Sequence, residues 1–281
     1  MRSLAIVVAL VAQASAGALQ TRTAQPVEPV ASMSWLRQHL NDPAVVVIAT
    51  DDTPPFDRGH IPTARFLGHD ATLDHDGHRL KPPSDLAAVL ARAGATDAAA
   101  RIVLYGEPLA VGWLFHAFAS LGHADRVSLL EGNYTAWLAA GLPSSTDTPS
   151  PGTGRLTVKP ATNVSVDRAW VRDHLSDKAT KLLDVRSPRE WDRGMIPNAT
   201  RFLWGDLYSD VATRRLKSPR EMAAVFERAG VGTGQTVVTY CAVGMRASLA
   251  YFAARAAGIP ARVYVGSWDD WTSDPSSPIS R

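Results

Sequence analysis

The sequence predicts an α/β protein built from two similar tandem domains, each with a parallel sheet flanked by helices. Three observations support this prediction. Much of the chain occurs twice in similar form, short β-branched runs alternate with amphipathic stretches, and a segment rich in Ser, Thr, Pro and Gly separates the two halves. The 281 residues are 46% hydrophobic and 20% charged, which is enough for two medium-sized domains with ordinary cores.

The internal repeat is clearest at residues 57–62 (DRGHIP), which correspond to residues 192–197 (DRGMIP), 135 positions later. Further pairs follow at nearly the same spacing: 35–40 with 170–175, 65–67 with 201–203, 87–94 with 223–230, and Trp137 with Trp271. Because the order of these pairs is never broken, duplication of one domain is the simplest explanation.

The start of the chain predicts export. Arg2 precedes an apolar run over residues 4–14, and residues 14–16 (ASA) form a small-x-small cleavage site, the pattern of a secretory signal peptide. The run is shorter than the roughly 20 apolar residues that span a bilayer, and no later segment is long and apolar enough to do so. We therefore expect a periplasmic or secreted protein that is soluble and has no membrane partner.

These features divide the chain into four segments. Residues 1–16 are the expected signal peptide, and residues 30–145 form an N-terminal domain. Residues 146–163 lack apolar periodicity and form the linker, and residues 164–275 form the C-terminal domain. Since two linked homologous domains already resemble a dimer, we expect a monomer.

Short β-branched and apolar runs predict the strands of each half. They cover residues 45–48 and 102–105 in the first half, and 182–185, 236–240 and 263–265 in the second. Amphipathic stretches between them predict helices, such as those at 83–94 and 219–230. This alternation favours parallel sheets with helices packed on their faces.

Charge and cysteine content argue against two classes of function. The net charge is +2 and no run of Lys and Arg forms a stripe, so no nucleic-acid partner is expected. The chain has one cysteine, which excludes an internal disulfide and a redox cycle between two of its own thiols. A group carried by this cysteine must therefore be passed to an acceptor from outside the chain.

The most informative segment joins a predicted strand to a predicted helix. The strand at 236–240 is followed by a six-residue loop and then by a helical run over 247–257. The loop consists of Cys241, Ala242, Val243, Gly244, Met245 and Arg246. At the carboxyl end of a parallel strand, loop N–H groups and the next helix N-terminus converge and form an anion cradle. The helix dipole and Arg246 both favour the thiolate of Cys241, which is the nucleophilic form.

This loop resembles the active loop of the rhodanese family of tandem sulfurtransferases. Three further motifs strengthen the resemblance, which covers nearly all of the chain after the signal segment: Asp184-Val185-Arg186, Glu190-Trp191 and Gly266-Ser267-Trp268. In that family a six-residue loop begins with the sulfur-carrying cysteine, and the N-terminal domain is a catalytically silent copy. The first half likewise lacks these motif residues: Gly106 stands where Cys241 would be, and Ala49 and Asp51 replace Asp184 and Arg186.

The resemblance also implies roles for the site residues. Cys241 is the expected catalytic residue, which accepts the sulfur as a persulfide. The residues expected to bind the substrate are Ala242, Val243, Gly244, Met245, Arg246 and Arg186. Asp184 and Arg186 stand at the end of a predicted strand, where a buried ion pair would orient the loop, and Glu190 is expected to be structural support.

No metal site or cofactor is expected. The stretch that comes nearest to a metal site holds His69, Asp70, Asp74, His75, Asp76 and His78. Its spacing resembles none of the common zinc patterns, and it lies in a turn-rich segment, where a solvated loop is sufficient explanation.

The sequence therefore predicts a thiosulfate sulfurtransferase. The Cys241 thiolate would take the outer sulfur of thiosulfate, release sulfite and pass the sulfur to cyanide or a thiol in a ping-pong cycle. Arg246 favours anionic thiosulfate. The small Ala242 stands where many thiosulfate enzymes have a basic residue and many mercaptopyruvate enzymes have glycine, and it leaves 3-mercaptopyruvate as an alternative donor.

The same residues allow two other functions. Cysteine-dependent phosphatases and arsenate reductases use a similar cradle, but they typically place five residues between cysteine and arginine, whereas four intervene here. The other alternative is a non-enzymatic periplasmic module that binds or relays sulfur, which predicts a persulfide that forms but turns over slowly.

Overall fold

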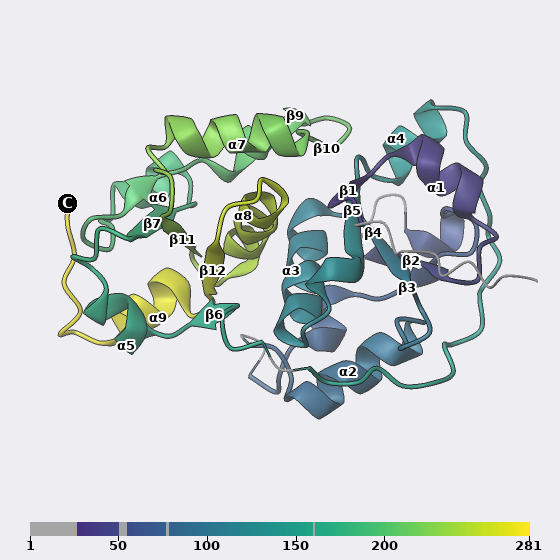
Figure 1. Cartoon of the computed structure of the whole chain (residues 1–281), viewed down its shortest axis with the longest axis horizontal. Helices are drawn as coiled ribbons and strands as arrows, with labels where there is room; N and C mark the ends of the chain where they lie inside the picture. The colour runs from purple at the N-terminus through teal and green to yellow at the C-terminus, as the bar shows by residue number, and fades with distance from the viewer. Residues whose placement is uncertain (1–26, 51–54, 77–78, 160) are drawn as a thin grey trace, which may run out of the picture.

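The computed structural model describes residues 27–50, 55–76, 79–159 and 161–281. The predicted signal peptide (residues 1–16), Asp51 and His78 lie outside the described residues. Within these ranges the chain forms two five-stranded parallel sheets flanked by helices (Figure 1), which confirms the predicted fold class.

The sheet of the N-terminal half has the strand order β1-β5-β4-β2-β3, with every neighbouring pair parallel. Its strands are β1 (Val30–Ala31), β2 (Val45–Thr50), β3 (Arg65–Phe66), β4 (Arg101–Gly106) and β5 (Val127–Leu130). The helices around it are α1 (Met33–His39), α2 (Pro83–Arg92), α3 (Pro108–Ser120) and α4 (Tyr134–Ala139), with 3-10 turns η1 (Phe56–Arg58), η2 (His69–Thr72) and η3 (Ala124–Arg126).

The sheet of the C-terminal half repeats this order as β6-β12-β11-β7-β8. Its strands are β6 (Ser165–Val166), β7 (Thr180–Asp184), β8 (Thr200–Arg201), β11 (Thr236–Tyr240) and β12 (Ala261–Tyr264), and a separate antiparallel hairpin holds β9 (Tyr208–Asp210) and β10 (Arg215–Leu216). The helices are α5 (Arg168–Asp173), α6 (Pro188–Trp191), α7 (Pro219–Arg228), α8 (Met245–Ala256) and α9 (Ser267–Ser273), with the 3-10 turn η4 (Trp204–Leu207).

Equivalent residues of the two halves make the same hydrogen bonds. The backbone N–H of Ile61 donates to the hydroxyl of Tyr105 at 3.2 Å, and that of Ile196 donates to the hydroxyl of Tyr240 at 3.1 Å. Both tyrosines are buried near the ends of corresponding central strands. The sequence repeat is therefore a repeat of the fold.

Local sequence explains where the helices begin. Helices α2, α3, α6 and α7 each start with proline, whose fixed φ suits the first helical position and whose missing N–H costs nothing there. Ser218 and Glu221 add a capping box to α7, in which each side chain binds the other residue's backbone N–H. The predicted strand at 236–240 has the bounds of β11, whereas the predicted helices at 83–94 and 219–230 each end two residues early, at Arg92 and Arg228.

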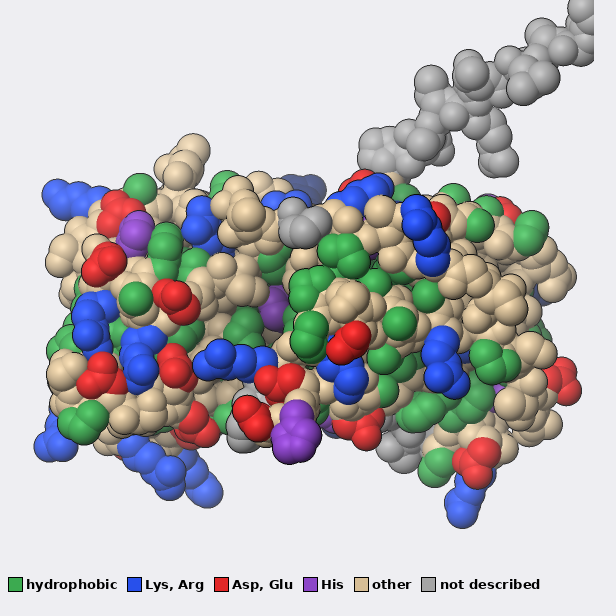
Figure 2. All heavy atoms as spheres, turned by 90° about the horizontal axis from the view of Figure 1, so that it is seen from below, with side chains coloured by type: hydrophobic (Ala, Val, Ile, Leu, Met, Phe, Trp, Pro, Cys, Tyr) green, Lys and Arg blue, Asp and Glu red, His purple; other side chains and the backbone are tan. Residues whose placement is uncertain are grey.

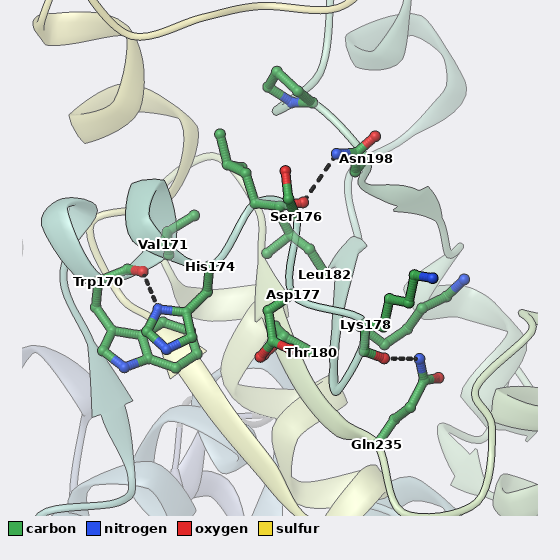
Figure 3. Close-up of a pocket in the computed structure, with 13 residues that line it drawn as sticks. Trp170, Val171, His174, Ser176, Asp177, Lys178, Thr180, Leu182, Asn198 and Gln235 are labelled. Carbon is green, nitrogen blue, oxygen red and sulfur yellow. Dashed lines mark hydrogen bonds between the residues drawn. The ribbon is translucent and has the colours of Figure 1, made fainter.

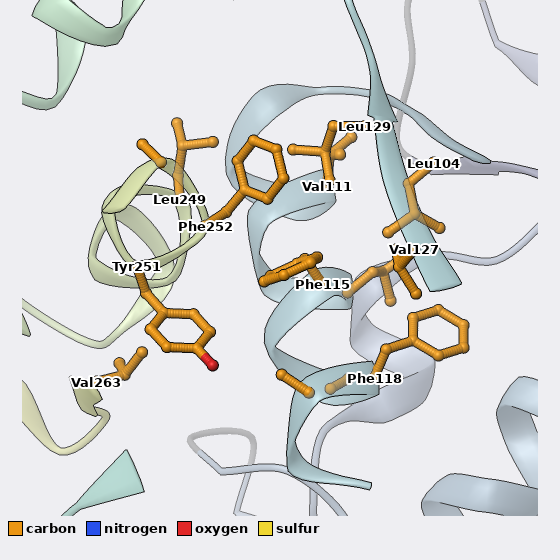
Figure 4. Close-up of a cluster of buried hydrophobic side chains, with 14 of the residues drawn as sticks. Leu104, Val111, Phe115, Phe118, Val127, Leu129, Leu249, Tyr251, Phe252 and Val263 are labelled. Atoms are coloured by element: carbon orange, nitrogen blue, oxygen red, sulfur yellow. The ribbon is translucent and has the colours of Figure 1, made fainter. Parts of the chain in front are cut away.

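The two halves share one continuous apolar core. Helices α3 and α8 lie side by side between the two sheets (Figure 1), and almost every side chain of α3 is buried, since it contacts both its own sheet and α8. Figure 4 shows Phe115 of α3 beside Tyr251 and Phe252 of α8, with 4.9 Å between the ring centroids of Phe115 and Phe252. The backbones meet at Gly112, where a Cβ would lie 2.7 Å from the Cα of Leu249.

The surface carries charges of both signs. On the face shown in Figure 2, Lys and Arg side chains are interspersed with Asp and Glu. None of the helices in the described ranges combines the length and apolar content that a bilayer span requires.

Candidate active site

Cys241 follows the central strand of the C-terminal sheet. Strand β11 lies between β12 and β7, so its carboxyl end opens at the middle of the sheet edge, where α/β proteins bind their ligands. The side chain of Cys241 is 1% exposed. Strand β11 therefore delivers the thiol to the centre of the sheet edge and keeps it almost out of contact with bulk water.

The loop turns sharply at Gly244. Its φ of 95° is in the left-handed region, and a Cβ there would lie 2.9 Å from the carbonyl oxygen of Val265, so glycine is required both by conformation and by space. The N–H of Gly244 donates to the Sγ of Cys241 at 3.1 Å. Helix α8 begins at Met245 and not at 247 as predicted, because Gly244 is its N-cap, and this places Arg246 in the first helical turn.

The beginning of α9 holds the loop from the other side. The N–H of Cys241 donates to the hydroxyl of Ser267 at 3.1 Å. The carbonyl of Cys241 accepts from the N–H of Trp268 at 2.9 Å, and that of Ala242 accepts from Asp269 at 3.1 Å. These contacts fix the two peptides that follow the thiol.

Arg246 forms a bidentate ion pair with Glu190. Its Nη1 and Nη2 donate to Oε2 and Oε1 of Glu190 at 2.6 and 2.7 Å. Hydrogen bonding by Arg246 lowers the pKa of Glu190 to about 2, and the same contact raises the pKa of Arg246. Glu190 also accepts from the hydroxyl and the N–H of Ser187. Much of the charge that Arg246 would offer to an anionic donor is therefore balanced by Glu190.

Asp184 and Arg186 form a buried ion pair beside the loop. Asp184 is 0% exposed and Arg186 1%, and Nη2 of Arg186 donates to Oδ2 of Asp184 at 2.6 Å. Asp184 also accepts from the hydroxyl of Tyr240 at 2.6 Å, and Nη2 of Arg186 donates to the carbonyl of Gly194 at 2.6 Å. These are the contacts of the predicted ion pair, and the guanidinium of Arg186 is buried and directed at protein groups, whereas its role in substrate binding stays a prediction.

The silent half reaches the loop through Trp113 of α3. Its ring is 1% exposed, and its Nε1 donates to the hydroxyl of Thr72 at 2.9 Å. The Cζ3 atom of this ring lies 3.4 Å from the position that a Cβ of Gly244 would occupy. The N-terminal half therefore forms part of the wall against which the loop packs.

The comparison with protein families agrees with this geometry. The family model of the rhodanese-like domain matches residues 32–140 and 167–274. The chain belongs to the rhodanese family. The two matched segments contain the two five-stranded sheets almost completely, and the second contains the Cys241 loop.

Relatives over most of the chain carry names from sulfur chemistry. The chain is 27% identical to "Thiosulfate sulfurtransferase" of Azotobacter vinelandii, over 87% of this chain and 94% of the relative. It is 29% identical to "Sulfur carrier protein TtuD" of Thermus thermophilus, over 90% and 97%. It is 30% identical to "Probable 3-mercaptopyruvate sulfurtransferase" of Pseudomonas aeruginosa, over 80% and 85%.

Solved structures share the fold at lower identity. The 3-mercaptopyruvate sulfotransferase SseA from Escherichia coli superposes with a TM-score of 0.74 and 21% identity, over 86% of this chain and 99% of that one. The anaerobic ergothioneine biosynthesis enzyme from Chlorobium limicola, solved with trimethyl histidine, gives 0.75 and 22%, over 90% and 70%. These likenesses concern the architecture of the two rhodanese-like domains.

A pocket of 440 Å³ opens between the two rhodanese-like domains beside the loop. The C-terminal domain contributes Val243 of the loop, and Val265, Gly266, Asp269 and Asp270, and the N-terminal domain contributes Asp74, Asp76 and Arg79. Ala242, Met245 and Arg246 are partly exposed and Val243 is exposed, whereas Gly244 is buried. A small molecule can therefore reach the outer face of the loop from this pocket.

The corresponding place in the N-terminal domain is closed. Gly106 ends β4 where Cys241 follows β11, with a φ of 135°. The hairpin of the C-terminal domain covers this place, since Arg214 lies 3.8 Å from Glu107 and Arg215 donates to Glu131 at 2.9 Å. The cavity left there measures 20 Å³. The N-terminal domain thus has no cysteine at this position and only a small cavity beside it.

A surface pocket of 470 Å³ lies at the opposite edge of the C-terminal sheet (Figure 3). Figure 3 shows Trp170, His174 and Asn198 around it, with Gln235 donating to the carbonyl of Lys178. It lies at the amino ends of β7 and β11, whereas Cys241 follows the carboxyl end of β11. The N-terminal domain has a similar hollow, into which the linker residues 152–153 extend, so this pocket belongs to the fold and not to the thiol site.

Within the described ranges, no group of three or more His, Cys, Asp and Glu side chains is arranged to hold a metal ion. The sequence does not mark Ser267 and Trp113 as neighbours of the loop. Ser267 belongs to a family motif, and only its difference from Asn133, its counterpart in the repeat, distinguishes it in the sequence. Nothing local marks Trp113, because its contact with the loop depends on how the two domains pack.

Proposed function

We propose that this chain is a sulfurtransferase that moves a sulfane sulfur from thiosulfate to cyanide or a thiol through a persulfide on Cys241. The observation that carries the proposal is the setting of the thiol. Cys241 lies at the carboxyl end of β11, the N–H of Gly244 is directed at its sulfur, and α8 begins four residues later. A helix N-terminus and a backbone donor favour the thiolate, which is the attacking form.

The loop can bind an anionic group that is attached to the sulfur of Cys241. The carbonyls of Cys241 and Ala242 accept from the start of α9, and in a trans peptide the N–H points opposite to the carbonyl. The N–H groups of Ala242 and Val243 are therefore directed away from α9, where they can donate to an anion above the thiol. This arrangement supports persulfide stabilisation by the backbone, which the family resemblance implied.

The first half-reaction is a displacement at sulfur. The Cys241 thiolate attacks the outer sulfur of thiosulfate, a new S–S bond forms, and the bond between the two thiosulfate sulfurs breaks. Sulfite leaves with that electron pair, so the enzyme becomes an anionic persulfide and no external oxidant is consumed. The helix N-terminus and the loop N–H groups stabilise the negative charge throughout.

The second half-reaction returns the enzyme to its starting state. Cyanide or a thiolate attacks the outer sulfur of the persulfide, and the Cys241 thiolate leaves with the electron pair of the S–S bond. The products are thiocyanate, or a persulfide of the acceptor thiol. Because the chain has a single cysteine, the acceptor comes from outside the chain, which is the ping-pong pattern.

Intact mass spectrometry tests the proposal. Wild type, the Cys241→Ser variant and wild type alkylated beforehand are each incubated with thiosulfate and then with cyanide. We expect a gain of one sulfur atom on wild type only, lost again with release of thiocyanate. Absence of any gain with thiosulfate would overturn the donor assignment, and a gain with 3-mercaptopyruvate instead would reassign it to that compound.

Two observations favour a second candidate, a sulfur carrier that holds the persulfide for a protein partner. A relative is named a sulfur carrier protein, and Cys241 is almost completely buried. A carrier would gain the sulfur atom but release it slowly to cyanide and small thiols. The rate of sulfur release as a function of acceptor concentration separates the carrier from the enzyme.

A further inference from the structure

Ser267 has an unusual backbone conformation for a residue other than glycine. Its φ is 56°, in the left-handed region, and it is completely buried at the start of α9. Such a conformation costs about 1 kcal/mol or more for a residue with a Cβ and persists only where the surroundings hold it in place. The contacts of Ser267 identify what holds it.

The hydroxyl of Ser267 links β12 to the Cys241 loop. It accepts from the N–H of Cys241 at 3.1 Å and donates to the carbonyl of Tyr264 at 2.9 Å. The two residues that follow it donate their N–H groups to the carbonyls of Cys241 and Ala242. The left-handed turn at Ser267 therefore allows one short segment to satisfy three backbone groups of the loop.

In the N-terminal domain the residue at the corresponding position has a different hydrogen-bonding role. Asn133 is the counterpart of Ser267, since each follows the glycine after β5 or β12 and precedes a buried tryptophan by four residues, Trp137 or Trp271. Asn133 has a φ of −93° and uses its side chain to cap its own helix, accepting from the N–H of Ala136. Ser267 makes no cap bond to α9, and its hydroxyl binds Cys241 instead.

We propose that Ser267 is a positioning residue for the sulfur-carrying loop. Its hydroxyl holds the N–H of Cys241 and its turn holds the next two peptides, so that the N–H groups of Ala242 and Val243 point away from α9 toward the charge on the sulfur. This inference rests on the proposed function for its chemistry, but its geometry concerns the thiolate of Cys241 alone. The difference between Ser267 and Asn133 coincides with the presence or loss of the cysteine in the two domains.

The Ser267→Gly variant isolates the hydroxyl. Glycine adopts the left-handed conformation without strain, so the turn and the bonds from Trp268 and Asp269 are expected to persist. The N–H of Cys241 and the carbonyl of Tyr264 lose their partner, and the loop loosens. We expect the pH midpoint for alkylation of Cys241 by iodoacetamide to rise by about one unit, which corresponds to about tenfold weaker stabilisation of the thiolate. Sulfur loading from thiosulfate should slow by a similar factor.

Two further variants separate the loss of the hydroxyl from other effects of the substitution. Ser267→Ala lacks the hydroxyl and cannot relax the backbone, so it should show the same shift in midpoint with a lower melting temperature than Ser267→Gly. Asn133→Gly is the matched control in the silent domain, which should lower the melting temperature through the lost helix cap and leave the alkylation profile unchanged.

The outcomes separate this inference from the proposed function. An unchanged alkylation profile in both Ser267 variants would refute the positioning role, and so would an equal shift in Asn133→Gly. Alkylation needs no sulfur donor, so a shifted profile in a protein that takes up no sulfur would support the positioning role while refuting sulfur transfer.

Discussion

Replacing Arg186 by methionine tests whether the buried ion pair beside the loop supports the C-terminal domain. The change leaves the carboxylate of Asp184, which is 0% exposed, with the hydroxyl of Tyr240 and the N–H of residue 186 as its donors. It also removes the donor to the carbonyl of Gly194. A methionine of similar length fills most of the space, so the main effect should be electrostatic.

The expected cost follows from these contacts. Breaking a buried pair by removing one partner costs about 3–5 kcal/mol, because the remaining charge is uncompensated. The double variant Asp184→Ala/Arg186→Met removes that charge as well and places alanine where the N-terminal domain has Ala49. We expect a loss of about 4 kcal/mol for Arg186→Met and about 2 kcal/mol for the double variant, so removing the second partner should recover about 2 kcal/mol.

Urea unfolding followed by tryptophan fluorescence measures these losses. Trp268 is a suitable probe, since the guanidinium carbon of Arg186 lies 4.2 Å from the centre of its ring. A cost below about 1 kcal/mol for Arg186→Met would refute the reasoning, because surface pairs have that size. A double variant that loses as much as the sum of the single variants would show that the two residues act independently.

Three other changes have defined outcomes. Gly244→Ala places a Cβ 2.9 Å from the carbonyl oxygen of Val265 at a φ of 95°, so we expect a loss of about 2 kcal/mol or more and a large fall in sulfur loading, measured by unfolding and intact mass. Glu190 has a pKa of about 2 when folded against 4.5 as the reference, so its pair with Arg246 contributes fully above pH 4.5, and this contribution is lost as the pH falls toward 2. Because the pair is partly exposed, that contribution is about 1 kcal/mol, and unfolding of Glu190→Gln between pH 5 and pH 3 should show a correspondingly smaller pH dependence. Gly112→Val adds bulk 2.7 Å from the backbone of α8, and calorimetry should show a melting temperature lowered by several degrees, whereas the same substitution at Gly141, which has open space, acts only through its backbone conformation.

The features that can be predicted from the sequence are those that depend on residues close together in the chain. The β-branched run at 236–240, the glycine three residues after Cys241 and the two copies of residues 57–62 each carry their information within a few positions. Strands and turns can be predicted from such patterns because backbone propensity and hydrophobic periodicity depend on residues a few positions apart. The repeat is recognised by comparing its two copies directly. The fold class and the position of the thiol were therefore predicted correctly.

The unpredicted part depends on contacts between distant segments. The partner of Arg246 is Glu190, 56 residues earlier, which accepts two hydrogen bonds from it, and the sequence does not indicate this pair. The buried ion pair of Asp184 and Arg186 is confirmed, but nothing in the sequence indicates that Arg186 also donates to the carbonyl of Gly194. The partner of a charged side chain is set by tertiary packing, which a single sequence does not encode locally.

The two domains cover each other's loops, and the cover is closed at Gly106 and open beside Val243. Hairpin residues 208–216 of the C-terminal domain seal the place of Gly106, where arginines face Glu107 and Glu131 and 20 Å³ is left. The corresponding segment of the N-terminal domain, bridged at Leu73 and Leu80, borders the pocket of 440 Å³ beside Val243. The place of Gly106, which has no thiol, is therefore closed, whereas the segment over Cys241 leaves access to the loop. The N-terminal domain is therefore part of the candidate site, because its segment lines the pocket and its Trp113 packs against Gly244.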